Sequence, residues 1–289
     1  MRFNHKRASE ICRTLVNAYQ NKKGIYSRKD IFPEFRPECM SNEDYSQYLF
    51  YANVVNYNTD AKILFKNLRE SKFKFTTENI LENSSELEKI LRLRFPKEGF
   101  RRLVNAAKDI KEKYNGNPMN LFTDDLKQTY KNIASIHGYG HKLTRMIVIL
   151  YKKHGLYDYE NESELEEAVD LHTVRISVNT RMIELKDKKE VYKTSVVKPM
   201  AEFFKKVCKK NRLSGLELHE SIWALGSTLC NEAVKKSDES ACKLYCPIEE
   251  YCKKEIFTAR KYGDGSKKAN GNFLINRGGM RKLALNLKW

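Results

Sequence analysis

Apolar residues recur along most of this chain at the spacing of an α-helix, and they do not alternate convincingly as in a β-strand. A clear example is the set Leu143, Met146, Ile147 and Leu150, which falls on one helical face. Comparable patterns predict helices over residues 1–20, 45–55, 61–68, 100–114, 121–133, 171 to about 184, 199–208 and 216–229, and one or two short helices over 76–95 that end at Phe95-Pro96. The predicted fold class is therefore all-α.

A tight glycine turn precedes the helix that carries Leu143. Its sequence is Gly138-Tyr139-Gly140, and Lys142 follows in the first helical turn. The N-terminus of a helix offers unpaired backbone N–H groups and the positive end of the helix dipole, which together suit a phosphate. A lone Gly-x-Gly before a helix is most often a plain connector, so this motif gains weight only in combination with others.

An acidic residue introduces the next amphipathic pattern, which begins at Leu171. Asp170 stands directly before it and is predicted to be the N-cap of that helix. An Asp at such a position is usually only a cap, and a Lys in a first turn is usually solvated. Both residues are consistent with a purely structural role.

Four of the seven cysteines fall within 23 residues near the C-terminal end of the chain. They are Cys230, Cys242, Cys246 and Cys252, with the spacing C-x11-C-x3-C-x5-C. Four thiolates this close in sequence can bind one metal centre, either a four-iron cluster or a zinc ion. Unlinked thiols are the simpler alternative.

Charge and composition point to a polyanionic partner. The hydrophobic content of 41% over 289 residues is enough to form a core. The formal net charge of +17 makes nucleic acid the first partner to consider. A merely basic protein is the alternative. We expect no membrane span and no signal peptide, and hence a reducing, intracellular location in which disulfides are rare.

Three segments together resemble the endonuclease III family of helix-hairpin-helix DNA glycosylases. They are the hairpin Ile136-His-Gly-Tyr-Gly-His-Lys142, the segment Val169-Asp-Leu-His-Thr-Val-Arg175, and the stretch from Ile222 to Cys252 that holds the four cysteines. Three features depart from the family pattern. His137 stands where the family has a proline, the interval from Lys142 to Asp170 is longer, and the first two cysteine gaps are wider.

The resemblance implies roles for individual residues. Lys142 would be the nucleophile and Asp170 the catalytic carboxylate, while the four cysteines would bind a [4Fe–4S] cluster, with zinc as the lesser possibility. DNA contacts are expected from Gly138, Tyr139, Gly140 and His141 in the hairpin, and from Asn58 and Thr59 at a helix interruption where the family feeds residues into the duplex.

The resemblance also implies a domain organisation. Residues 43–165 would form a helical domain with the hairpin. Residues 1–42 and 166–255 would form a helical cluster domain, followed by a basic extension over 256–289.

The sequence therefore predicts an enzyme that extrudes a damaged base from double-stranded DNA and cleaves its N-glycosidic bond, with AP-lyase activity through a Schiff base on Lys142. We expect it to act as a monomer. Two alternatives stay open. One is a non-catalytic nucleic-acid-binding protein with the same hairpin and cluster, and the other is a glycosylase-like enzyme for a modified nucleoside or RNA.

Overall fold

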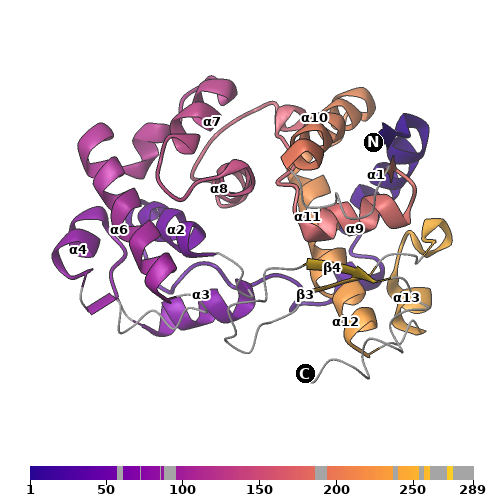
Figure 1. Ribbon diagram of the computed structural model, residues 1–289, viewed down its shortest axis with the longest axis horizontal. Coiled ribbons are helices and arrows are strands. Elements are labelled where there is room, and N and C mark those ends of the chain that lie inside the picture. The colour runs from indigo at the N-terminus through magenta and orange to yellow at the C-terminus, as the bar shows by residue number, and fades with distance from the viewer. Residues whose placement is uncertain are drawn as a thin grey trace. The chain divides into compact units, whose positions relative to one another are not determined.

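The computed structural model describes residues 1–56, 61–71, 73–84, 86–87, 96–185, 194–236, 240–253, 257–260 and 272–275. The chain divides into two compact units (Figure 1). We call Phe32–Asn161 the hairpin unit, and Met1–Ile31 with Glu162–Trp289 the cysteine unit. Helices dominate both, so the all-α prediction is confirmed. The predicted DNA contacts Asn58 and Thr59, and most of the basic extension, lie outside the described residues.

The hairpin unit is built around α2, whose residues from Tyr45 to Val55 are all buried. A helix with no polar face must be covered on all sides, and α2 packs against α6 and α8. The Ser41 side chain caps it by accepting a bond of 3.1 Å from the N–H of Asp44. The helices of this unit are α2 (Asn42–Val55), α3 (Ala61–Glu70), α4 (Thr77–Glu82), α6 (Pro96–Lys113), η2 (Pro118–Leu121), α7 (Leu126–Ala134) and α8 (His141–Lys153).

The cysteine unit has α11 at its centre, because this helix packs against α1, α9 and α12. In α11, residues 218–222 form a continuous buried run. The helices of this unit are α1 (His5–Gln20), η1 (Gly24–Ser27), η3 (Glu162–Glu164), α9 (Leu171–Asn179), α10 (Thr194–Asn211), α11 (Gly215–Ser227), α12 (Leu229–Lys236), α13 (Ser240–Tyr245) and η5 (Glu249–Tyr251).

Several helix boundaries differ from the predicted ones. Helix α6 begins at Pro96, before the predicted start at residue 100, because proline suits the first helical position, where its missing N–H has no helical partner to lose. The helix predicted from Leu121 begins only at Leu126, where Asp125 caps it. The helix after Asp170 stops at Asn179, since Arg181 adopts a positive φ of 60°.

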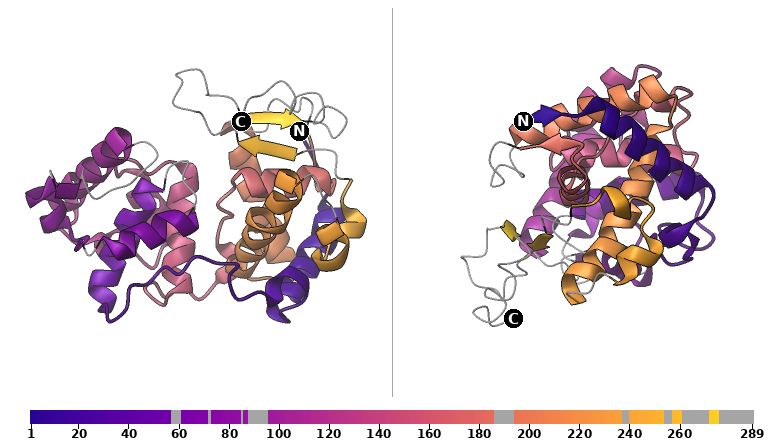
Figure 2. Two further views of the ribbon diagram at one scale, coloured as in Figure 1. Left: turned by 90° about the horizontal axis from the view of Figure 1, so that it is seen from below. Right: turned by 90° about the vertical axis from the view of Figure 1, so that its right-hand side faces the viewer.

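Short strands complete the cysteine unit, although the sequence predicted none. Strand β1 (Arg2–Phe3) pairs antiparallel with β2 (Ile183–Glu184), and β3 (Phe257–Arg260) pairs antiparallel with β4 (Asn272–Ile275), which appear as yellow arrows in Figure 2. Runs of two to four residues are too short to show a hydrophobic period. Among the described helices, none is both long and apolar enough to cross a membrane.

Candidate active site and cysteine loop

The helix that opens after the glycine turn is capped differently from its neighbours. Side chains cap the N-termini of α1, α2, α4, α7, α9 and α11, through Asn4, Ser41, Thr76, Asp125, Asp170 and Ser214. The N-cap of α8 is Gly140, which has no side chain to supply such a bond. Gly140 is exposed, and a Cβ built on it would meet nothing within 4 Å. The first turn of α8 therefore lacks a side-chain cap at a sterically open point.

Gly138 makes the hairpin turn possible. Its φ of +90° lies where side chains are strained, and a Cβ at this position would lie 3.3 Å from Val54 Cγ1 and 3.5 Å from Arg102 Cβ. The turn thus depends on glycine both for its backbone conformation and for its close packing on α2 and α6.

Tyr139 anchors the hairpin in the core. Its side chain is 5% exposed, stacks on Phe50 with ring centroids 4.8 Å apart, and donates a hydrogen bond of 2.9 Å to the Phe50 carbonyl. Its N–H donates to the carbonyl of Ile136 at 3.1 Å. Burial raises the pKa of the phenol well above its ordinary value. Since both groups are used inside the unit, Tyr139 positions the turn, and its predicted contact with DNA stays a prediction.

A carboxylate on α6 holds the other side of the turn. Asp109 accepts the N–H of His137 at 2.8 Å and pairs with Lys113 at 2.6 Å. Burial opposes ionisation of Asp109, but the bonds from Lys113 and His137 outweigh it and lower the pKa of the carboxyl. His137 replaces a proline of the family pattern, and its N–H provides a tether that proline could not form.

Lys142 is the second residue of α8 and is half-buried. His141 precedes it in the same turn, and its carbonyl accepts a bond of 3.0 Å from Arg145. The hairpin therefore brings Gly138, Gly140, His141 and Lys142 together in the hairpin unit. Asp170 belongs to the cysteine unit.

Asp170 caps α9 through a reciprocal capping box, as predicted. Its Oδ1 accepts the N–H groups of His172 at 2.7 Å and Thr173 at 3.1 Å, and its own N–H donates to Thr173 Oγ1 at 3.4 Å. Accepting backbone N–H bonds favours the ionised form of a carboxyl. The cap therefore fixes the orientation of Asp170 and favours its negative charge.

Arg175 supports the same helix, and sequence reasoning assigned it no role. This guanidinium is 2% exposed and donates to Asn231 at 3.2 Å, contacts His172 Nδ1 at 3.0 Å, and bonds the carbonyl of Gly226. It thereby ties α9 to α11 and α12. A fully buried arginine is rare without partners, but nothing in the sequence pattern shows where those partners lie.

Three of the four cysteine thiols lie close enough to the fourth, Cys246, to influence it electrostatically. Burial raises the pKa of Cys246 most, and Cys230, Cys252 and Cys242 raise it further. Burial also raises the pKa of Cys230, against the opposing effect of the nearby Arg175. Cys246 is thus a thiol whose pKa is raised by all three other cysteines.

The loop that carries these thiols is fastened to the rest of its unit. The Tyr251 hydroxyl donates to Glu10 at 2.8 Å, and Arg7 lies over the Tyr251 ring at 4.6 Å. The N–H of Lys253 donates to the carbonyl of Asn179 at 2.8 Å. Helices α1 and α9, which are far away in sequence, therefore hold the loop in place.

The donor set suits a thiolate-bound metal centre. Within the described ranges, no three His, Cys, Asp or Glu side chains are arranged as ligands of one metal ion. The thiols of Cys230, Cys242 and Cys252 nevertheless surround Cys246 closely enough to affect its pKa, and four cysteines are the usual ligands of an iron–sulfur cluster. On the chemistry of the donors, the residues fit such a group.

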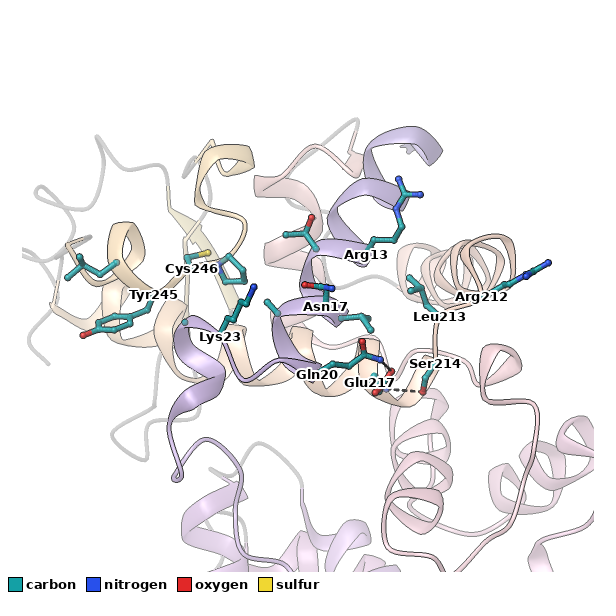
Figure 3. Close-up of a pocket in the computed structure, with 16 residues that line it drawn as sticks. Arg13, Asn17, Gln20, Lys23, Arg212, Leu213, Ser214, Glu217, Tyr245 and Cys246 are labelled. Carbon is teal, nitrogen blue, oxygen red and sulfur yellow. Dashed lines mark hydrogen bonds between the residues drawn. The ribbon is translucent and has the colours of Figure 1, made fainter.

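A groove of about 820 Å³ runs along one side of the cysteine unit (Figure 3). Cys246 forms part of its wall, together with the cationic residues Arg13, Lys23 and Arg212. Cys246 is also one of the four predicted metal ligands. The groove therefore connects one edge of the cysteine loop with solvent.

Comparisons with known proteins identify the fold. No protein-family model matches the sequence, and no curated protein matches it either. Among solved structures, a trapped covalent intermediate of endonuclease III with DNA, in an estranged-adenine complex, has a TM-score of 0.56 at 14% identity, covering 78% of this chain and 87% of that one.

Two further structures agree. A non-covalent endonuclease III–DNA complex has a TM-score of 0.57 at 14% identity, covering 86% of this chain and 98% of that one. A thermostable thymine-DNA glycosylase has a TM-score of 0.55 at 14% identity, covering 85% and 98%. The chain has the DNA glycosylase fold that the sequence resemblance implied.

The two hairpin glycines should respond differently to alanine. We expect Gly138→Ala to destabilise the protein by about 1–2 kcal/mol, because alanine is strained at positive φ and its methyl group would crowd Val54. Gly140→Ala has open space and an extended backbone, so its stability should stay close to wild type. Chemical denaturation of the two variants makes the comparison, and equal losses would contradict this account of the turn.

Proposed function

We propose that this protein is a DNA glycosylase with AP-lyase activity, in which Lys142 is the nucleophile and Asp170 the catalytic carboxylate. The observation that carries the proposal is the glycine turn at the start of α8, which leaves that helix without a side-chain cap and places Lys142 in its first turn. The chain that carries this turn has the fold of a DNA glycosylase.

Binding to DNA is the first requirement, and the charge of the chain meets it. An excess of 17 positive charges favours association with phosphates and makes it strongly salt-dependent. The start of α8, where Gly140 supplies no side-chain cap, would bind a phosphate, as helix N-termini commonly do. The proposed substrate is double-stranded DNA with a damaged base, extruded before the chemistry begins.

The covalent route to base loss follows from an amine nucleophile. The Lys142 amine, once deprotonated, attacks the sugar C1′ while the C1′–N bond breaks, and the base leaves with the bonding electrons and takes up a proton. Opening of the sugar ring then gives a protonated Schiff base on Lys142. Loss of a proton from C2′ expels the 3′ phosphate and nicks the strand. The endonuclease III complex described as a trapped covalent intermediate supports this route by likeness of fold.

Asp170 would act on the charge that develops during bond cleavage. Positive charge accumulates on the sugar as the base departs, and a fixed carboxylate stabilises it. The cap bonds from His172 and Thr173 hold the carboxylate in place and favour its ionised form. Asp170 could also accept the proton from the Lys142 amine.

The four cysteines would hold a [4Fe–4S] cluster, with Cys230, Cys242, Cys246 and Cys252 as its ligands. When bound, such a group would cross-link α12, α13 and the segment that follows them. The chain itself docks this loop through Tyr251 and Lys253. The basic side chains of this loop would then face the phosphates of the DNA backbone from a fixed position.

Covalent trapping tests the catalytic assignment. We expect borohydride to link wild-type protein to duplex oligonucleotides that carry an abasic site or one member of a panel of oxidised, alkylated and deaminated bases. Lys142→Ala should abolish the adduct, since no amine would remain to form the Schiff base. Asp170→Asn should lower the rate of base release by roughly 100-fold or more, the scale at which a fixed electrostatic group acts.

The control variant is Lys127→Ala, which removes one exposed lysine of α7 and should trap as wild type does. Adduct formation by Lys142→Ala would refute the assignment of the nucleophile. Base release without any adduct would show a monofunctional glycosylase. DNA binding without either reaction would favour the non-catalytic binding protein, and activity on a modified nucleoside or RNA would favour the other alternative.

Metal analysis tests the cysteine loop. We expect about four iron and four sulfide per chain in anaerobically purified protein, because four thiolates complete the coordination of such a cluster. Cys246→Ser should lose most of the iron and make residues 240–253 sensitive to protease, whereas Cys39→Ser, at an exposed cysteine distant in sequence, should lose neither. One zinc per chain without sulfide would instead identify a zinc site.

A further inference from the structure

A second carboxylate, Glu167, lies three residues before Asp170 and shares a partner with it. The Glu167 side chain is 1% exposed. Its Oε1 accepts the Thr173 hydroxyl at 3.0 Å, and the same hydroxyl lies 3.4 Å from Asp170 Oδ1. A hydroxyl has a single proton, so the shorter contact with Glu167 receives it. Thr173 therefore couples the two carboxylates.

His219 supplies the positive charge of this cluster. Its Nδ1 lies 3.0 Å from Glu167 Oε1, and the imidazole is 5% exposed. Burial on its own would lower the pKa of His219, but Glu167, Asp170 and Glu220 outweigh burial and raise it. The surroundings of His219 on α11 thus favour its protonated form.

Three further titratable groups lie near Glu167 or His219. Cys12 of α1 and Cys208 of α10 face Glu167, and burial is the main cause that raises the pKa of both thiols, that of Cys208 to about 12. Glu220 accepts a hydrogen bond from the Tyr19 hydroxyl. His219 is therefore the residue whose charge offsets that of Glu167.

Glu167 has little else to compensate it. Within the described part of the chain, its Oε2 is buried and has no hydrogen-bond partner. A buried carboxylate that loses its counter-ion is costly, and a nearby carboxylate then becomes harder to ionise. Without His219, that neighbour is Asp170.

We propose that Glu167 and His219 are positioning residues that control the charge of Asp170, with His219 offsetting Glu167 and Thr173 joining the pair to the Asp170 cap. This inference rests on the proposed catalytic role of Asp170. The proposal gives Glu167 and His219 a role beyond joining α9 to α11. It predicts that removing the charge of Glu167 and removing that of His219 shift the pKa of Asp170 in opposite directions.

Opposite shifts are the test of this coupling. Glu167→Gln removes a negative charge and should move the acid limb of the base-release rate to lower pH. His219→Gln removes the compensating cation and should move it to higher pH, each by about one pH unit. The double variant should return close to wild type. Glu217→Gln, on the same helix but bonded to Gln20, is the control and should leave the limb unchanged.

Carbon-13 NMR of the side-chain carboxyl groups provides a readout without activity. The Asp170 signal is assigned by its loss in Asp170→Asn, and its titration midpoint should shift in the same two directions. Unchanged midpoints, or shifts of the same sign in both variants, would overturn the proposal. Thermal unfolding checks that each variant folds. If one of the single variants does not fold, the double variant, which carries neither charge, is compared with the other single variant instead.

The two proposals can fail separately. If wild-type protein releases no base from any substrate but the NMR midpoints shift as expected, the charge coupling holds and the proposed enzyme activity fails. If base release occurs and depends on Asp170 but neither the acid limb nor the NMR midpoints move, the activity stands and the role of Glu167 and His219 fails.

The same pair should make stability depend on pH. A histidine with a higher pKa in the folded than in the unfolded state stabilises the fold fully below the unfolded pKa of about 6.5, and this contribution is lost as the pH rises through the folded pKa. We therefore expect the thermal midpoint of wild type to fall across that range. His219→Gln should lack this decrease, and an identical pH dependence in both proteins would show that the histidine does not titrate as described.

Discussion

The backbone N–H groups at the start of each helix need partners, and the way this chain supplies them organises the whole structure. In the described part of the chain, six α-helices receive a side-chain cap, each worth about 1 kcal/mol relative to alanine. At α8 the N-cap is Gly140, which costs only about a few tenths of a kcal/mol relative to such a cap. Tyr139 in the core and Asp109 on α6 hold the turn from both sides. The turn before α8 is fixed by these contacts, so it does not depend on a side-chain cap from Gly140.

Asp170 shows the opposite solution at the other predicted catalytic position. Here one carboxylate both caps α9 and is proposed to act on the substrate, so folding and chemistry use the same atoms. A cap has a defined direction and prefers a charged acceptor, and both properties suit an electrostatic catalyst. The cost is that the surroundings must keep the carboxylate ionised. Glu167 makes this harder and His219 makes it easier, which is why the two residues are best understood together.

Sequence reasoning recovered the features that local patterns encode. The helix that ends at Val55 and the cap at Asp170 both follow from periodicity and residue type. It did not find what tertiary contacts decide, such as the packing of Tyr139 in the core and the burial of Arg175, whose partners lie on other elements. The first turn of α6, from Pro96, was missed because it precedes the apolar pattern, although proline is favoured at the first helical position.

At 14% identity to endonuclease III, few side chains can be responsible for the shared fold. What persists is a set of physical requirements that different residues can meet. His137 illustrates the point, because the family pattern places a proline there to rigidify the turn. This chain uses the His137 N–H and the Asp109 carboxylate to hold the same turn instead. A proline at this position would remove that donor, so the substitution of His137 and the presence of Asp109 are parts of one solution.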